Sequence, residues 1–297
     1  MLVTVVITTH KRPPELVERA IQSVVAQTHK ELEIIVVDDS PEDYENRAGV
    51  KKMVATYATK SVTYIAHGEC MGACAARNTG LSVAKGEYIG FLDDDDEWMP
   101  EKIEEQLKEF VSEDVALVYC GRKTVYDETG EIVIKPLLCV CEDVYAKLMF
   151  ENFIGSTSCP LLKTEALRSI GGFDVEMQSA QDYDVWLRIV QKYSIRYVNK
   201  PLVIYHFHRD EQITKNPTKK VAGLERIIMK NYDFLSKHRE AYWTNYMGLV
   251  TWYIKAGKTG TAISAWLKAA FKQPFKILPN IKSLYALIKV WVVVNTR

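Results

Sequence analysis

The sequence predicts an α/β protein in which a mostly parallel, doubly wound sheet carries helices on both faces, followed by a C-terminal helical extension. Two observations support this prediction. Short apolar runs alternate with longer amphipathic stretches through the first hundred residues. Beyond residue 214 the composition turns from acidic to strongly basic, and the apolar positions follow a helical period.

The first half of the chain alternates strand and helix. Continuous apolar runs are typical of parallel strands buried on both faces, and they predict strands at 2–7, 32–37, 62–66 and 88–92. The segments between and after them predict helices at 13–27, 48–59, 73–84 and 100–111. Pro13 and Pro14 suit the first turn of a helix, and Gly86 follows the third helix as a helix-ending glycine.

The second half is less regular. Strands are predicted at 115–120, 195–198 and 202–207, a loop followed by a strand within 155–162, and a hairpin around Glu128–Gly130. Helices are predicted at 144–151 and 164–170, in QDYDVWLRIVQK from 181, twice within 242–272 with a break at Gly257–Gly260, and at 281–294. In the last of these, Lys282 and Lys289 share one face and apolar residues the other, which is typical of a helix that lies on a membrane surface.

Charge divides the chain into two predicted domains, 1–214 and 215–297. Residues 1–214 hold 23 Lys and Arg against 35 Asp and Glu, and residues 215–297 hold 15 against 3. The basic region predicts contact with an anionic membrane surface, whereas packing on the first domain or on a second subunit is the alternative. We expect no nucleic acid partner.

Cysteine spacing and the N-terminal residues bear on the compartment. The close pairs Cys70/Cys74 and Cys139/Cys141 lack a matching second half of a zinc motif, so reduced structural thiols are expected. Leu2–Ile7 lead directly into a strand, which indicates no signal peptide. A cytoplasmic location is expected, peripheral on the inner face of the plasma membrane.

Polar clusters follow three of the predicted strands: Thr8/Thr9, Asp38/Asp39 and Asp93–Asp96. In open α/β sheets, ligands bind outside the carboxyl ends of the strands. Four adjacent carboxylates at a buried strand end need a counter-charge, for which a divalent cation with an anionic ligand is suited. The alternative interpretation is a solvated acidic turn before the helix at 100–111.

Two nucleotide-binding fingerprints are absent from the sequence. No G-x-G-x-x-G follows the first strand, and no G-x-x-x-x-G-K-[ST] occurs. The site predicted at the strand ends must therefore bind its ligand without either glycine-rich loop.

Five motifs, in order and at matching spacing, resemble the inverting nucleotide-sugar glycosyltransferases of family two, which have the GT-A fold. They are TTHKR (8–12), IIVVDDS (34–40), ARNTGLSVAKGEYIGFLDDDDEW (76–98), GGFD (171–174) and QDYDVWLRI (181–189). The resemblance covers about residues 1–214. It implies a GT-A type sheet, a nucleotide-diphosphate-sugar donor and Mn²⁺ or Mg²⁺ as cofactor.

The resemblance also implies residue roles. Asp182 matches the catalytic base, and Asp95 matches the last acid of the D-x-D motif, which holds the metal. His208 matches a position that reaches the phosphates or the metal. The remaining matches are donor-binding: Thr8 and Arg12 beside the nucleotide, Asp38 and Asp39 on its base or ribose, Arg77 and Asn78 near the diphosphate, and Asp93 and Asp94 in the aspartate run.

Some of these assignments have alternatives. The fourth aspartate also allows the register Asp94/Asp96. Ser179-x-x-Asp182 fits a capping box, in which Asp182 only caps a helix. Arg77 could form a helix-surface salt bridge, and Trp98, expected to open a helix, could stack on a sugar or belong to the core. The chain also departs from the family, with His10-Lys11 in place of Tyr-Asn and Gln181 in place of Glu.

The predicted function is a metal-dependent, inverting glycosyltransferase. It would move a sugar, with a UDP-sugar as the expected donor, to an acceptor hydroxyl on a growing polysaccharide or lipid-linked glycan. The alternatives are a nucleotide-sugar-binding scaffold without catalysis and a sugar nucleotidyltransferase. The latter needs a glycine-rich G-x-G-T-R-type loop after the first strand, and TTHKR is not one.

Overall fold

The computed structural model describes residues 1–57, 61–126, 129–134, 143–207 and 216–274. They form two compact units. The first, the sheet unit, comprises Met1–Val144, Asn152–Val175 and Asp182–His208, and the second, the helical unit, comprises Tyr145–Glu151, Glu176–Gln181 and Arg209–Arg297. The predicted domain boundary at 214/215 lies outside the described residues.

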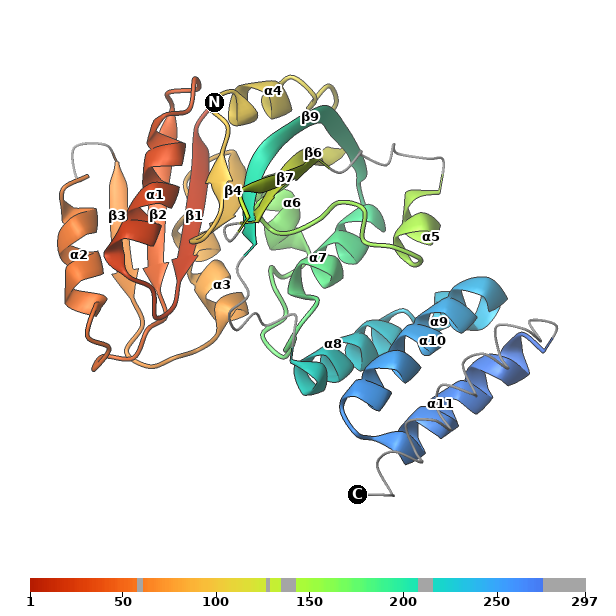
Figure 1. The fold of residues 1–297 in the computed structure, drawn as a ribbon. Helices are drawn as coiled ribbons and strands as arrows, with labels where there is room; N and C mark the ends of the chain where they lie inside the picture. The colour runs from red at the N-terminus through yellow and green to blue at the C-terminus, as the bar shows by residue number, and fades with distance from the viewer. Residues whose placement is uncertain (58–60, 127–128, 135–142, 208–215, 275–297) are drawn as a thin grey trace. The chain divides into compact units, whose positions relative to one another are not determined.

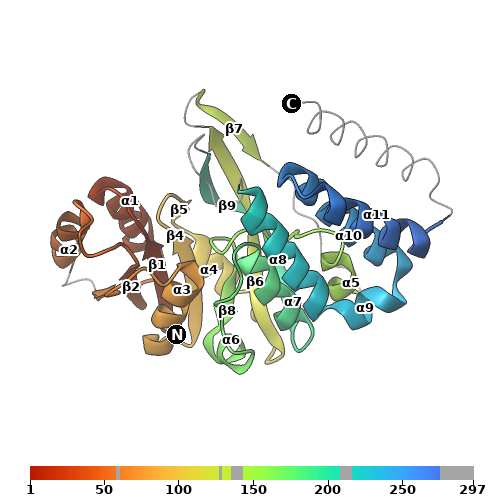
Figure 2. The same cartoon turned by 90° about the horizontal axis from the view of Figure 1, so that it is seen from below.

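The first half of the sheet is parallel, as predicted. Its strands are β1 (Val3–Thr9), β2 (Leu32–Asp38), β3 (Val62–Ala66) and β4 (Tyr88–Asp93), in the spatial order β3-β2-β1-β4. Helices α1 (Pro14–Val25) and α2 (Arg47–Ala55) lie on one face and α3 (Ala73–Val83) on the other (Figures 1 and 2). The predicted doubly wound arrangement is confirmed.

The sheet continues past β4 with mixed strand directions. The order is β4-β8-β6-β9-β5, formed by β8 (Leu161–Lys163), β6 (Val115–Tyr126), β9 (Ser194–Phe207) and β5 (Glu97–Trp98). Strand β8 is antiparallel to both neighbours, and β6 is parallel to β9. Strand β7 (Glu131–Ile134) forms the predicted hairpin with β6.

Two predictions for these strands were wrong. Trp98 does not open a helix but lies in β5, and the next helix, α4, is short (Lys102–Leu107). The two strands predicted on either side of Pro201 are one strand, β9. Its pairing with β6 jumps from Val198 to Pro201 between two consecutive β6 residues, so the proline is accommodated by a local irregularity instead of ending the strand.

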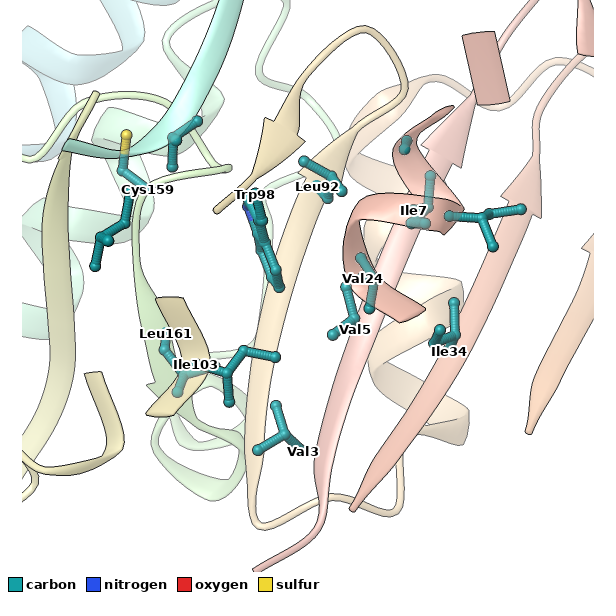
Figure 3. Packing of buried hydrophobic residues seen from close by; sticks show 14 of the residues in the cluster. Val3, Val5, Ile7, Val24, Ile34, Leu92, Trp98, Ile103, Cys159 and Leu161 are labelled. Atoms are coloured by element: carbon teal, nitrogen blue, oxygen red, sulfur yellow. The ribbon is translucent and has the colours of Figure 1, made fainter. Parts of the chain in front are cut away.

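The core lies between the sheet and its helices. Figure 3 shows Val3, Val5 and Ile7 of β1 beside Val24 of α1 and Ile34 of β2, all nearly inaccessible to solvent. Side chains of this kind stabilise the fold by roughly 1.5–3 kcal/mol each when fully buried. Three further short helices complete the connections: α5 (Val144–Leu148), α6 (Thr164–Ser169) and α7 (Gln181–Val190).

Among the described residues, the helical unit contains most of α5 together with α8 (Pro217–Lys230), α9 (Tyr232–Lys237), α10 (Arg239–Lys255) and α11 (Thr259–Lys272). The predicted helix pair with a break at Gly257–Gly260 is confirmed, whereas α8 and α9 were not predicted. Within this unit Asn245 donates to the Met149 carbonyl, which ties α10 to the segment after α5.

No helix among the described residues combines the length and the apolar content needed to cross a bilayer. The helix predicted at 281–294, with Lys282 and Lys289, and the pair Cys139/Cys141 lie outside the described residues.

Candidate active site

The sheet register brings the three predicted polar clusters to one edge. Thr9 of β1 pairs with Asp38 of β2, and Thr8 pairs with Asp93 of β4. The three strands are parallel and neighbouring strands lie about 4.8 Å apart, so the residues form one row at the carboxyl ends. This row is the place where open α/β sheets bind ligands.

The aspartate run after β4 forms a tight turn. The turn is closed by a hydrogen bond of 3.0 Å from the Asp96 amide to the Asp93 carbonyl. The side chains of Asp93 and Asp95 are 29% and 27% exposed, whereas the Asp94 side chain is 9% exposed and Asp96 is fully buried. Exposure therefore alternates along the run, and Asp93 and Asp95 are the two carboxylates open to solvent.

Arginines supply counter-charges at this turn. The Arg12 guanidinium donates to Asp94 at 3.1 Å and to Asp95 at 2.9 Å. Arg19 donates to the Asp95 carbonyl at 2.9 Å, and Arg77, only 7% exposed, donates to Asp93 at 2.8 Å. Arg77 is therefore not a helix-surface residue. The aspartate run is not a simple solvated turn, because arginines contact it. These arginines also balance part of its negative charge, so the run does not depend on a metal cation alone.

Burial changes the charge of the run. Burial raises the pKa of Asp94 to about 7, with Arg12 opposing the shift. Burial, followed by the charges of Asp93 and Asp95, raises the pKa of Asp96 well above its usual range. The Asp96 carboxyl accepts a hydrogen bond of 2.6 Å from Ser158. The buried carboxyls of Asp94 and Asp96 therefore hold protons more readily than an ordinary aspartate, which reduces repulsion within the run.

The acids after β2 are anchored by the protein itself. Asp38 accepts hydrogen bonds from the Ser40 amide at 2.9 Å and from Tyr64 at 2.7 Å. Asp39 accepts from the amides of Met71 and Gly72, both at 2.8 Å. Burial works to raise the Asp39 pKa, but these donors and a nearby histidine outweigh it, so the pKa is lowered. Asp39 is therefore ionised and holds the loop before α3 against the end of β2.

Asn78 fixes a second loop. Its side-chain amide donates to the Phe173 carbonyl at 2.7 Å and its oxygen accepts from the Phe173 amide at 2.8 Å. The preceding residue, Gly172, has φ +67°, and a Cβ there would lie 2.5 Å from the Asn78 oxygen. Asn78 and Gly172 together hold the GGFD segment beside α3. A role of Asn78 near a diphosphate stays a prediction.

Asp182 stands in the first turn of α7 and is linked to the aspartate run through one loop. Asn152 lies 3.4 Å from the Asp182 carboxylate, and Thr157, in the same loop, donates to Asp93 at 3.1 Å. The side-chain NH of Trp186 in α7 donates to the Gly155 carbonyl at 3.1 Å and holds the loop between them. The segment 152–158 thus contacts both the predicted base and the predicted donor site.

The predicted capping box at Ser179 is wrong. Helix α7 begins at Gln181, with Ala180 at φ +56° before it, so Ser179 does not occupy the capping position. The Ser179 hydroxyl donates instead to the Lys219 carbonyl at 3.0 Å. Asp182 is therefore not part of a capping box with Ser179, but its carboxylate accepts a hydrogen bond of 2.8 Å from the Tyr183 amide in the first turn of α7.

Two residues with predicted roles remain, Trp98 and His208. Trp98 belongs to the core, 3% exposed, and its ring NH donates to the Ser158 carbonyl at 2.9 Å. His208 lies outside the described residues. Sequence reasoning missed Arg19, Thr157 and Ser158, because no local motif marks a side chain that reaches the aspartate run from elsewhere in the chain.

The residues present fit a hard divalent cation. Mg²⁺ and Mn²⁺ prefer carboxylate oxygens together with water and phosphate oxygens. Asp93 and Asp95 offer such oxygens on the exposed side of the turn, and the buried Asp94 and Asp96 support the turn from behind.

This sheet has threonines at the end of β1, acids at the ends of β2 and β4, and a further acid, Asp182, at the start of α7, and it is typical of the glycosyltransferases with the GT-A fold. The family model described as glycosyl transferase family 2 matches residues 4–171. The chain belongs to this family, and the predicted resemblance is confirmed.

Curated relatives agree with this assignment. The putative colanic acid biosynthesis glycosyl transferase WcaA of Escherichia coli (strain K12) is 31% identical over 243 residues, covering 77% of this chain and 81% of WcaA. The uncharacterized glycosyltransferase YwdF of Bacillus subtilis (strain 168) is 30% identical over 238 residues, covering 78% and 84%.

Among solved structures, S. aureus TarS 1-349 superposes with a TM-score of 0.60 at 16% identity, covering 92% of this chain and 89% of that one. The same protein in complex with UDP-GlcNAc also gives a TM-score of 0.60. At this identity the likeness shows the fold.

Proposed function

We propose that this glycosyltransferase moves a sugar from a UDP-sugar to a hydroxyl of a growing polysaccharide or lipid-linked glycan, with inversion at the anomeric carbon and with Mn²⁺ or Mg²⁺ as cofactor. The observation that carries the proposal is the single loop that contacts Asp182 and Asp93. This loop links the carboxylate that we propose as the base to the aspartate turn, which supports a base beside the donor site. Two similar proteins support the choice of acceptor and donor: WcaA is a putative colanic acid biosynthesis glycosyl transferase, and TarS has been solved in complex with UDP-GlcNAc.

The transfer is a single displacement. The acceptor oxygen forms a bond to the anomeric carbon as its proton passes to the Asp182 carboxylate. The bond from the anomeric carbon to the phosphate oxygen breaks, and UDP leaves with the electron pair. One displacement inverts the configuration, and an ionised aspartate suffices because the hydroxyl proton becomes acidic as the bond forms.

Charge growing on the leaving diphosphate needs compensation. A divalent cation bound at Asp95, with Asp93 beside it, would supply most of it. The chain adds fixed positive charge through Arg77, held by Asp93, and Arg12, held by Asp94 and Asp95. Asp38 and Asp39 stand at the nucleoside end of the row, where they would contact the base or the ribose.

The test is Asp182→Asn, measured with a panel of UDP-sugars and oligosaccharide acceptors in Mn²⁺. Asparagine keeps the shape of the side chain but cannot accept the proton, so turnover should fall by about 10²–10⁴-fold with donor affinity nearly unchanged. Asp233→Asn, an exposed acid of α9, is the matched control and should keep full turnover. Full turnover in Asp182→Asn would refute the assignment of the base.

The same assay separates the alternatives. A binding scaffold would bind the donor without releasing UDP in the presence or absence of acceptor. A nucleotidyltransferase would form a nucleotide sugar from a sugar phosphate and UTP. NMR of the glycoside product reads the anomeric configuration directly, and retention would refute the single displacement.

We also propose that the enzyme works at the inner face of the plasma membrane, where its basic C-terminal region docks on anionic lipid. The described part of this region adds one observation to the charge count. Ile263, Leu267 and Phe271 follow one another at four-residue spacing on α11 and are 40%, 55% and 88% exposed. Apolar side chains beside lysines suit an anionic interface.

A further inference from the structure

A second cluster of metal-binding side chains lies at the nucleoside end of the row. His10 follows β1, Asp39 follows β2 and Cys70 precedes α3, and one ligand atom from each lies within 4.8 Å of the others. The Cys70 sulfur is 3.4 Å from Asp39 Oδ2 and 3.9 Å from His10 Nδ1. The aspartate run is not part of this cluster.

The two distances from the Cys70 sulfur are close to those of a tetrahedral zinc centre. Zinc binds sulfur at about 2.3 Å and nitrogen or oxygen at about 2.0–2.2 Å, so neighbouring ligand atoms lie about 3.3–3.7 Å apart. The observed separations of 3.4 and 3.9 Å differ from this by only a few tenths of an ångström. One nitrogen, one oxygen and one sulfur ligand select zinc over Mg²⁺ or Mn²⁺, which prefer oxygen alone.

The cluster is held in place by surrounding contacts. Asp39 is 3% exposed and is fixed by the loop amides described above. His67 donates to Asp39 Oδ1 at 2.7 Å and its other ring nitrogen lies 2.9 Å from the Thr79 hydroxyl. Hydrogen-bonded carboxylate ligands of this kind are a regular part of metal sites. His10 and Cys70 are exposed, so a metal ion reaches them from solvent.

We propose that His10, Asp39 and Cys70 bind Zn²⁺, with water in the fourth position, and that the bound Zn²⁺ competes with the sugar donor for Asp39. The competition rests on the proposed function, whereas the metal site does not. Binding releases the Cys70 thiol proton to solvent. The His10 ring, which now donates from Nδ1 to the Asp39 carbonyl at 2.9 Å, shifts its proton to Nε2 and gives up that hydrogen bond.

The first experiment titrates the metal-free full chain with Co²⁺ in excess Mg²⁺, which occupies the aspartate turn. We expect a thiolate-to-cobalt absorption band at one equivalent and its loss when one equivalent of Zn²⁺ is added. Cys70→Ser should abolish the band. The matched control Cys74→Ser, a buried thiol of α3 outside the cluster, should keep it. His10→Ala should weaken Zn²⁺ binding by at least ~10²-fold, since even outer partners of a metal site are worth 10–100-fold. A missing band, or a band that persists in Cys70→Ser, overturns the site.

The second experiment measures UDP binding to the same proteins with and without one equivalent of Zn²⁺. We expect Zn²⁺ to weaken UDP binding at least tenfold in the unsubstituted chain and in Cys74→Ser, and to leave Cys70→Ser unaffected. If Zn²⁺ binds but the UDP affinity is unchanged, the proposed competition for Asp39 is refuted and the proposed zinc site stands. A chain that binds no UDP even without Zn²⁺ overturns the proposed function and the competition together, and the cobalt titration still decides the site.

Discussion

Replacing the buried Lys102 by methionine should make the stability of the protein less dependent on pH. Lys102 is fully buried in α4, where its ammonium donates to Gln106 at 2.7 Å and lies 3.8 Å from the centre of the Trp98 ring. Among the described residues, the groups whose charges act on its pKa are the thiols of Cys120 and Cys159 and not a carboxylate. Burial lowers its pKa from 10.5 to about 8.

The magnitude follows from this shift. Each pKa unit is worth about 1.36 kcal/mol, so a difference of 10.5 − 8 costs the fold about 3 kcal/mol at pH 7. Because the folded pKa lies below the unfolded one, the unfolded chain binds the extra proton between these values. Stability therefore rises with pH from about 8 toward 10.5, and the cost falls to about 1 kcal/mol at pH 10.

Lys102→Met keeps the length of the side chain and removes the charge. It also leaves the Gln106 oxygen without its donor, which costs about 1–3 kcal/mol at any pH. The informative quantity is therefore the difference between variant and unsubstituted chain at two pH values. We expect the variant to lose about 2 kcal/mol of relative stability between pH 7 and pH 10.

Urea unfolding of the full chain at pH 7 and pH 10, followed by tryptophan fluorescence, measures this difference. Lys85→Met, whose side chain is 80% exposed, is the control and should change stability by less than about 0.5 kcal/mol at both pH values. If the difference in free energy of unfolding between Lys102→Met and the unsubstituted chain is the same at pH 7 and pH 10, burial does not lower the Lys102 pKa and the reasoning fails.

Three further predictions concern the site and the C-terminal region. Asp95→Asn should weaken Mn²⁺-supported UDP binding by at least ~10²-fold with an unchanged melting temperature; calorimetry that finds unchanged binding, or full turnover in excess chelator, would refute the metal assignment. Gly172→Ala should destabilise the protein by about 1–3 kcal/mol more than Gly130→Ala, because both glycines have φ +67° but only at Gly172 does a Cβ meet Asn78; equal losses in urea would show that backbone strain alone matters. Full-length protein should sediment with anionic but not neutral vesicles, and a chain ending at Pro274 should lose this; equal binding to both vesicles would leave packing as the role of the tail.

The sequence predicted the parallel half of the sheet well for a physical reason. Strands buried on both faces must be apolar throughout, so β1, β2 and β4 appear as nearly continuous runs, with observed ends at most two residues from the predicted ones. Strand β3 lies at the edge of the sheet and is only partly buried, yet its short run VTYIA is still rich in strand-forming residues. Strand β5 has two residues and no pattern of its own, and its place depends on pairing with β9 far along the chain. The helix α8 did carry a signal, since Asn216 caps it and Pro217 opens it.

The candidate site was predicted by residue type but not by geometry. Adjacent aspartates are chemically equivalent in a sequence, so the exposed pair could not be distinguished from the buried pair. The distinction arises because Ser158, some sixty residues away, hydrogen-bonds Asp96 from within the protein. The partners of Arg12 were equally unpredictable, because the contact spans more than eighty positions of the chain.

Exposed and buried carboxylates alternate along the aspartate turn, so the number of residues in the run decides which carboxylates face solvent. Removing any one aspartate leaves three in a row, and a pattern search still finds Asp-x-Asp. In the protein, the shortened segment can no longer span from the end of β4 to β5 with its present closure, because the Asp96 amide and the Asp93 carbonyl are three residues apart. In the shortened run, a carboxylate that is now exposed would point toward Ser158, or the hydrogen bond that Ser158 donates to Asp96 would be lost. The sequences of homologues whose aspartate runs differ in length should therefore be aligned on the buried aspartate that accepts the hydrogen bond from the serine, which is Asp96 in this chain, and not on the first aspartate of the run.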